Sequence, residues 1–306
     1  MSPALRASDG RPRVGPMFGA IAVLMAAVVA IQVVRDRGWT PYEPEDSVLW
    51  IRSGETAKRM ALSYDNIVSD VYWIRAVIYY GGRRRATSHR GFDQLHPLLD
   101  LVTSLDPHFK VAYRFGALFL SEPPPGGPGQ PDKAIALLER GVEQDGAWEY
   151  YEDIGFVHYW WRHDYVSAAD WFKRAAARPG APNWLLGLAA TTLAVGGSRD
   201  SSRQLWTQLL NDVDAAYIRN QAEHRLQQLD AMDAIDELAR VLQRFRDREG
   251  RMPRSWQELA TAERLRGIPV DPAGFPFVVD AQTGHIDVSK QSPMWPLPVE
   301  PKTGPR

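Results

Sequence analysis

The sequence predicts an all-α protein, with an N-terminal transmembrane helix, a solenoid of paired helices and a small C-terminal β-hairpin. Three observations predict this. An uncharged apolar run covers residues 14–34, helix-pair patterns recur between residues 65 and 215, and nine prolines follow Gly250. The 306 residues suffice for one large or two modest domains with their own cores.

Composition excludes several classes of function. The chain has 36 basic and 37 acidic side chains, a net charge of −1, so no overall field favours nucleic acid as a partner. It has no cysteine, which excludes disulfides and thiolate metal sites. The seven histidines form no metal-binding pair, and no phosphate loop, dinucleotide fingerprint or nucleophile elbow occurs. We therefore expect no metal, no cofactor, no small-molecule substrate and no enzymatic activity.

The first element is the predicted transmembrane helix, residues 14–34, preceded by a short tail, residues 1–13. Its 21 residues form a helix of about 30 Å, the thickness of the hydrocarbon core. Three arginines precede it, and two arginines followed by acidic residues come after it, which favours a cytoplasmic N-terminus. In a Gram-negative bacterium the body would then be periplasmic, on a single-pass inner-membrane anchor. A cleaved secretory signal is the alternative, because Val28 and Ala30 have the small side chains of a cleavage site.

Residues 35–64 are predicted to be a linker and a leading helix. Apolar residues then recur at spacings of three and four, which is typical of one helical stripe. The stripe consists of Ala57, Met60, Ala61, Tyr64, Ile67, Val68, Val71 and Ile74.

A helix-pair pattern is clearest between residues 150 and 180. Gly155 is the small residue at which two antiparallel helices would cross, because a small residue lets helices touch while aromatic side chains fill the groove beside it. The partner positions are Tyr151, Ala168, Phe172 and Ala175, and Pro179 ends the unit.

On these residues the chain resembles the tetratricopeptide repeat family. Similar units contain Phe115 with Gly116, Trp73 with Tyr80, and Trp184 with Gly187. The resemblance covers residues 65–215 and implies a solenoid of helix pairs. The insert from Glu122 to Pro131 is expected to be an exposed loop within the second unit, either a plain connector or a proline-rich docking motif.

Residues 216–250 are predicted to form a capping helix, and residues 251–306 a Pro-rich tail with a hairpin of strands 275–279 and 285–288. The tail is similar to the DPxGxPF element of type II secretion pseudopilins, here Asp271 to Phe277. The chain lacks the N-terminal processing motif of a pseudopilin, which argues against a pilin.

The candidate protein-binding residues follow from the repeat resemblance, because the first helix of each repeat in this family faces a groove. The implied positions are Glu149, Glu152, Phe156, Tyr159 and, in the preceding unit, Tyr113. A structural role is the alternative for each kind of residue. The carboxylates would also suit the start of a helix, and most aromatic side chains are expected in the core.

The predicted function is a membrane-anchored tetratricopeptide-repeat scaffold for protein–protein interaction on the periplasmic side of a bacterial inner membrane. Its partners would be proteins in or at the membrane. The alternative is a structural subunit of an envelope complex, for secretion, a pilus or another assembly. An enzyme is the third option.

Overall fold

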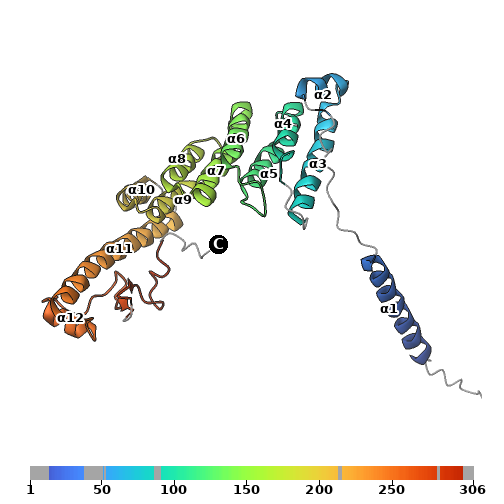
Figure 1. Ribbon diagram of the computed structural model, residues 1–306. Coiled ribbons are helices and arrows are strands. Elements are labelled where there is room, and N and C mark those ends of the chain that lie inside the picture. The colour runs from blue at the N-terminus through green and yellow to red at the C-terminus, as the bar shows by residue number, and fades with distance from the viewer. Residues whose placement is uncertain are drawn as a thin grey trace, which may run out of the picture.

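The computed structural model describes residues 14–37, 51, 53–85, 91–212, 216–280 and 283–298, without the side chains of residues 14–18, 20, 36 and 212. In this part of the chain it contains twelve α-helices, one π-helical turn and one two-stranded antiparallel sheet near the C-terminus (Figure 1). The structure confirms that the chain is mostly helical with a small C-terminal hairpin.

Helix α1 (Val14–Arg37) stands apart from the other helices in Figure 1. The large apolar side chains described for it, such as Leu24 and Ile31, are exposed. Across the described residues, no helix is both long enough and apolar enough to cross a membrane. The first side chains of the predicted span, those of residues 14–18, and the whole predicted tail, residues 1–13, lie outside the described residues.

The predicted continuous stripe over residues 57–74 is wrong in two respects. Helix α2 (Gly54–Met60) ends before α3 (Asp65–Arg85) begins, because Leu62 and Ser63 both have positive φ, 49° and 72°. The core face of α3 is also a different one. It consists of Ser69, Tyr72, Ala76, Tyr79, Tyr80 and Arg83, whereas most of the predicted stripe is exposed.

From α3 onward, consecutive helices pack against each other as a continuous stack (Figure 1). The further helices of the stack are α4 (Leu95–Leu105), α5 (Lys110–Ser121), α6 (Pro131–Asp145), α7 (Trp148–Val157), α8 (Tyr165–Ala176), α9 (Trp184–Val195) and α10 (Arg199–Asp212). Helix α5 also contacts α7 directly. That contact brings together two helices that are separated in the sequence by the whole of α6.

Glycines let these helices approach closely. A Cβ atom on Gly155 would lie 2.5 Å from Cε1 of Phe172 in α8. A Cβ on Gly141 of α6 would lie 2.9 Å from the ring of Tyr150 in α7, at Cε1. Carbon atoms do not approach this closely without displacement, so only glycine fits at these two crossings.

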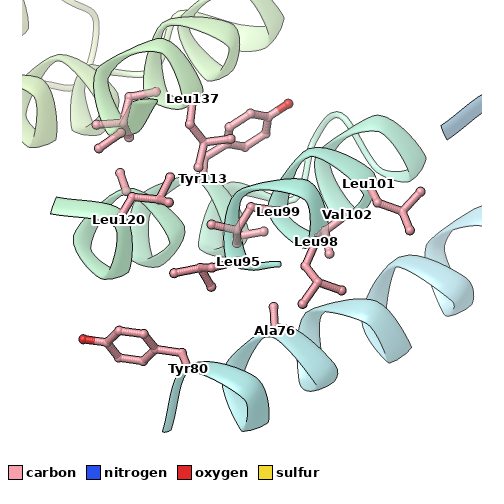
Figure 2. Close-up of a cluster of buried hydrophobic side chains, with 14 of the residues drawn as sticks. Ala76, Tyr80, Leu95, Leu98, Leu99, Leu101, Val102, Tyr113, Leu120 and Leu137 are labelled. Atoms are coloured by element: carbon pink, nitrogen blue, oxygen red, sulfur yellow. The ribbon is translucent and has the colours of Figure 1, made fainter. Parts of the chain in front are cut away.

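The largest cluster of buried side chains extends from α2 to α7. Figure 2 shows Ala76 of α3 pointing toward Leu98 of α4, whereas the ring of Tyr80 extends sideways from the end of α3. That ring stacks on Phe119 of α5 at a centroid distance of 4.2 Å. The aromatic rings join the same cluster: Trp73 of α3 stacks on Phe119 of α5 at a centroid distance of 6.1 Å. These contacts hold α3 and α5, the first helices of two neighbouring pairs, side by side.

The loop between α5 and α6, residues 122–130, is only partly exposed, unlike the exposed loop that the sequence predicts. It folds back onto the end of α5, since the backbone nitrogen of Gln130 donates to the carbonyl of Leu120 at 2.7 Å. Gly127 is buried within it. The loop is therefore packed against the end of the helix pair.

The chain continues as one long helix, α11 (Ala216–Glu249), which packs on α10 and carries the C-terminal segment (Figure 1). That segment comprises α12 (Trp256–Ala262) and the strands β1 (Val278–Val279) and β2 (Ile286–Asp287). Leu242 and Phe245 of α11 share a core with Phe277, Ile286 and Met294. The C-terminal segment is thus bound to α11 by a common apolar core.

The strands are two residues long each, much shorter than predicted, because the preceding residues form a turn. Asp271 is buried, and its Oδ1 accepts hydrogen bonds from the backbone nitrogens of Ala273 and Phe275, both at 2.9 Å. The hydroxyl of Ser292 donates to the other carboxylate oxygen. The aspartate of the DPxGxPF element therefore fixes the turn that leads into β1.

Candidate functional site

A hollow of about 380 Å³ lies between α5 and α7, next to the π-helical turn η1 (His158–Arg162). We call it the α5–α7 groove. It is lined by Arg114, Phe115, Ala117, Leu118, Leu138, Asp153, Phe156, Val157, Trp160 and Trp161. Of the five residues predicted to bind a partner, Phe156 is the one that lines this hollow.

One half of the groove is apolar and accessible. The side chains of Phe115 and Trp160 are about half exposed, and that of Leu118 slightly less. Phe156 is half-buried, because its ring packs edge-to-face on Phe172 at a centroid distance of 5.1 Å. Large apolar side chains left accessible around a hollow are the usual features of a binding surface.

A charged ladder beside the hollow links α5 to α7, and two of its members, Arg114 and Asp153, line the hollow. The ammonium of Lys110 lies 3.2 Å from a carboxylate oxygen of Glu149. One turn further along, the guanidinium of Arg114 binds both carboxylate oxygens of Asp153, at 2.5 and 3.0 Å. The same guanidinium lies 3.6 Å from Glu152. Two cations thus face three carboxylates.

The excess of carboxylates changes their acidity. Burial, followed by repulsion from Asp153, raises the pKa of Glu152 to about 7, and Arg114 only partly offsets this. Burial also raises the pKa of Asp153 against the opposing hydrogen bond from Arg114. The pKa of Glu149 is lowered: burial opposes the ionised form, but hydrogen bonds to its own backbone and to Lys110 outweigh that effect. The net charge of the ladder therefore depends on pH near neutrality.

Replacing Glu152 by glutamine should flatten the pH dependence of stability. The folded state keeps the proton of Glu152 up to about pH 7, whereas the unfolded state releases it near the ordinary value of 4.5. Between these values the folded state binds more protons, so the free energy of unfolding falls as the pH rises. Urea denaturation at several pH values should show a smaller downward slope between about pH 5 and 7 for Glu152→Gln than for the wild type. Equal slopes in the two proteins would contradict the assignment.

The π-helical turn places the tryptophans of the groove. At its end His163 takes a left-handed conformation, φ 52°, and its backbone nitrogen donates to the carbonyl of His158. Asp164 then caps α8, accepting a hydrogen bond from the backbone nitrogen of Ser167 at 3.0 Å. A π turn contains one more residue than an α turn, so it rotates the side chains that follow relative to the α-helical register. Trp160 and Trp161 line the groove for this reason.

The remaining predicted residues lie away from the hollow. Tyr113 is a core residue, only 2 % exposed, with its ring edge-to-face on Tyr150. Its ring is therefore not available to a partner, and the expectation that Tyr113 faces a binding groove is wrong. Glu149 and Glu152 belong to the ladder, and Glu152 is 8 % exposed. Tyr159 is half-buried against Tyr165 at a centroid distance of 5.2 Å.

Sequence reasoning missed Arg114, Phe115, Leu118 and the two tryptophans. The concentration of aromatic residues between Trp148 and Phe172 was the available signal for Trp160 and Trp161. For the α5 residues no local signal exists, because their role depends on α5 and α7 lying side by side.

Neither the groove nor the rest of the described chain holds a group of three or more His, Asp or Glu side chains arranged to bind a metal ion. No protein-family model, curated protein or solved structure matches the chain. A function therefore has to be argued from the geometry of the groove.

Proposed function

We propose that this protein is a membrane-anchored helical scaffold that binds a protein segment in the α5–α7 groove. The observation that carries the proposal is the accessible apolar half of the groove, formed by Phe115, Leu118, Phe156 and Trp160, beside a ladder with an excess of carboxylates. Aromatic side chains in such a setting supply most of the binding energy at protein interfaces. The stack of helix pairs, similar to tetratricopeptide repeats in sequence pattern, would serve as the rigid support.

The groove favours a partner segment of particular chemistry. An apolar side chain would fill the hollow between Phe115 and Phe156, where it displaces water from apolar surface. A lysine or arginine next to it would pair with Asp153, the carboxylate of the ladder that lines the hollow. Because the helices on both sides are already fixed by the core, little entropy is lost on the scaffold's side when the segment binds.

Membrane anchoring is part of the proposal. Its support is the uncharged sequence of residues 14–34 and the exposed apolar side chains of α1. The arginines before the run favour a cytoplasmic N-terminus and a periplasmic body. Anchoring would raise the effective concentration of the scaffold near a partner in the same membrane.

Fractionation should show the anchor and its orientation. We expect the intact protein to stay with membranes after carbonate extraction, and protease added outside spheroplasts to degrade the body. Protection of the body would contradict the proposed orientation. Release into the soluble fraction with a shortened N-terminus would indicate a cleaved signal instead.

Replacing both Phe156 and Trp160 by alanine should weaken partner binding by about 2 kcal/mol or more, roughly thirtyfold, if either is a hot spot. The partner is identified by crosslinking in native membranes and its affinity measured with purified proteins. Helical content should change little, since both side chains are partly exposed. Val166→Ala is the control, because Val166 is an apolar residue on α8 that is as exposed as Trp160 and lies away from the groove.

Three outcomes distinguish the possibilities. Retained affinity in the double variant would contradict the groove as the binding site. A partner that co-purifies at fixed stoichiometry would favour a structural subunit of an envelope complex. Turnover of a small molecule by the purified chain would favour an enzyme.

A further inference from the structure

The outer face of α3 carries an exposed apolar stripe. It consists of Tyr64, just before the helix, and Ile67, Val71, Ile74 and Ile78, each between 46 and 66 % exposed. Their spacing alternates between three and four residues, the pattern by which one helix packs along another. The opposite face of α3, with Tyr72 and Ala76, already packs on α4. The stripe is thus a second apolar face, separate from the core of the chain.

The position of α3 in the stack makes this face unusual. A terminal unit in a helical stack needs a polar outer surface, because no neighbour covers it. At the other end of the stack, α11 packs on α10. At the α3 end, the outer face has large aliphatic side chains where polar ones are expected. The face is therefore built for contact with a further helix.

The charges along α3 indicate the direction of that helix. Asp65 and Asp70 lie in its first half, Arg75 at its centre, and Arg83 to Arg85 in its last turn, where Arg83 is buried on the core face. A second α3 packed in parallel and in register would place Asp70 beside Asp70 and Arg85 beside Arg85, all exposed, and like charges side by side cost free energy. An antiparallel α3 centred between Val71 and Ile74 would place Asp70 of each copy level with Arg75 of the other, and would also oppose the two helix dipoles favourably.

We propose that two copies of this chain associate through their α3 stripes, antiparallel, about a two-fold axis between Val71 and Ile74. Each copy covers the α3 face that the described helices of the other leave exposed, which is the self-complementary arrangement that two-fold symmetry requires. A lipid surface fits the stripe less well, because interfacial helices have basic polar faces and Asp70 lies exposed in the first half of this one. This proposal does not depend on the α5–α7 groove.

Crosslinking tests the arrangement directly, because the chain has no cysteine of its own. In an antiparallel pair centred between Val71 and Ile74, the two copies of residue 67 lie about 16 Å apart along the helix axes, at 1.5 Å per residue. Full-length Ile67→Cys in detergent should therefore link poorly to itself with a short bismaleimide. Mixed with Ile78→Cys, it should form a dimer efficiently.

Association should also depend on the stripe. Sedimentation of the full-length protein in detergent should show a dimer, and Val71→Glu with Ile74→Glu should weaken the dimer more than tenfold while the circular dichroism spectrum is unchanged. Val111→Glu is the control, a similarly exposed valine on α5. The proposal would be overturned by a wild-type monomer at tens of micromolar or by efficient self-linking of Ile67→Cys. It would also be overturned by a dimer that survives the two glutamates, which is the result that pairing through α1 would give. A monomer whose α3 cysteines become protected from maleimide in the presence of lipid vesicles would likewise overturn the proposal.

Discussion

Gly155→Leu is expected to lower the free energy of unfolding by about 3 kcal/mol, the upper end of the usual cost of overpacking. Even a Cβ at this position would lie 2.5 Å from Cε1 and 2.6 Å from Cδ1 of Phe172. Phe172 of α8 is fully buried, packed against Phe156 of α7 and Ala189 and Leu193 of α9. The helices must therefore separate, or the phenylalanine must leave its rotamer. Chemical denaturation measures the loss.

The control for this prediction is Gly81→Ala. Gly81 is also a helical glycine, near the end of α3, but nothing lies within 4 Å of a Cβ placed there. Alanine at an open helical position should stabilise the protein by about 0.5 to 1 kcal/mol. If Gly155→Leu left the stability unchanged, the close crossing of α7 and α8 would not exist as described.

The same substitution should also affect the groove. Asp153 and Phe156 lie within two residues of Gly155, on the helix that would be displaced. We therefore expect a loss of partner binding together with the loss of stability. This coupling distinguishes Gly155→Leu from Phe156→Ala with Trp160→Ala, which should weaken binding at nearly constant stability.

The pairing of α7 with α8 could be predicted from the sequence because close contact restricts residue type. The sequence pattern puts Gly155 at a helix crossing with Tyr151 and Phe172 beside it, and all three are buried in the structure. A crossing at this distance accepts only small residues, so the pattern is visible without knowledge of the rest of the fold. The long helix α11 was predictable for a related reason, since its apolar stripe from Ile218 to Phe245 extends over about eight turns.

The orientation of α3 could not be predicted in the same way. Two of its faces have apolar residues at helical spacing, one with Tyr72 and Ala76 and the other with Ile67, Val71 and Ile74. Periodicity shows that a face is apolar and does not show which neighbour covers it. The predicted stripe followed the aliphatic face. In the structure the face with Tyr72 and Ala76 packs against α4 instead, because small and flat side chains allow a close approach.

The groove needed tertiary information for most of its parts. Phe156 follows from its place in the repeat pattern, but the π turn shifts Trp160 and Trp161 out of the α-helical register on which such a pattern depends. The ladder joins residues 39 positions apart, as in Arg114 with Asp153. No local pattern connects them, because the contact exists only once α6 has brought α5 and α7 together.

Arg114→Met should be the other strongly destabilising change, with a loss of about 3 kcal/mol at pH 8. The carboxylates of Glu152 and Asp153 have side-chain exposures of only 10 and 20 %, and Arg114 is the cation that neutralises both. Removing one partner from a largely buried ion pair leaves the others desolvated without compensation. Methionine keeps much of the length of the side chain, so the loss reflects charge more than packing.

The loss of stability caused by Arg114→Met should depend on pH. The pKa of Glu152 is already raised to about 7, so at about pH 5 this carboxyl is protonated and needs no cation. The cost of Arg114→Met should therefore be smaller at pH 5 than at pH 8, and adding Glu152→Gln should reduce it at pH 8 as well.

Arg203→Met is the matched control for this charge effect. Arg203 also binds two carboxylates, those of Asp230 at 2.5 Å and Asp233 at 2.6 Å, but the two aspartates are 57 and 53 % exposed. Water solvates them when the arginine is lost, so the expected cost is below about 1 kcal/mol. Equal losses for the two arginines would mean that the ladder between α5 and α7 is solvated like an ordinary surface. The excess negative charge proposed to attract a basic partner segment would then be screened, and specificity would depend on the apolar half of the groove alone.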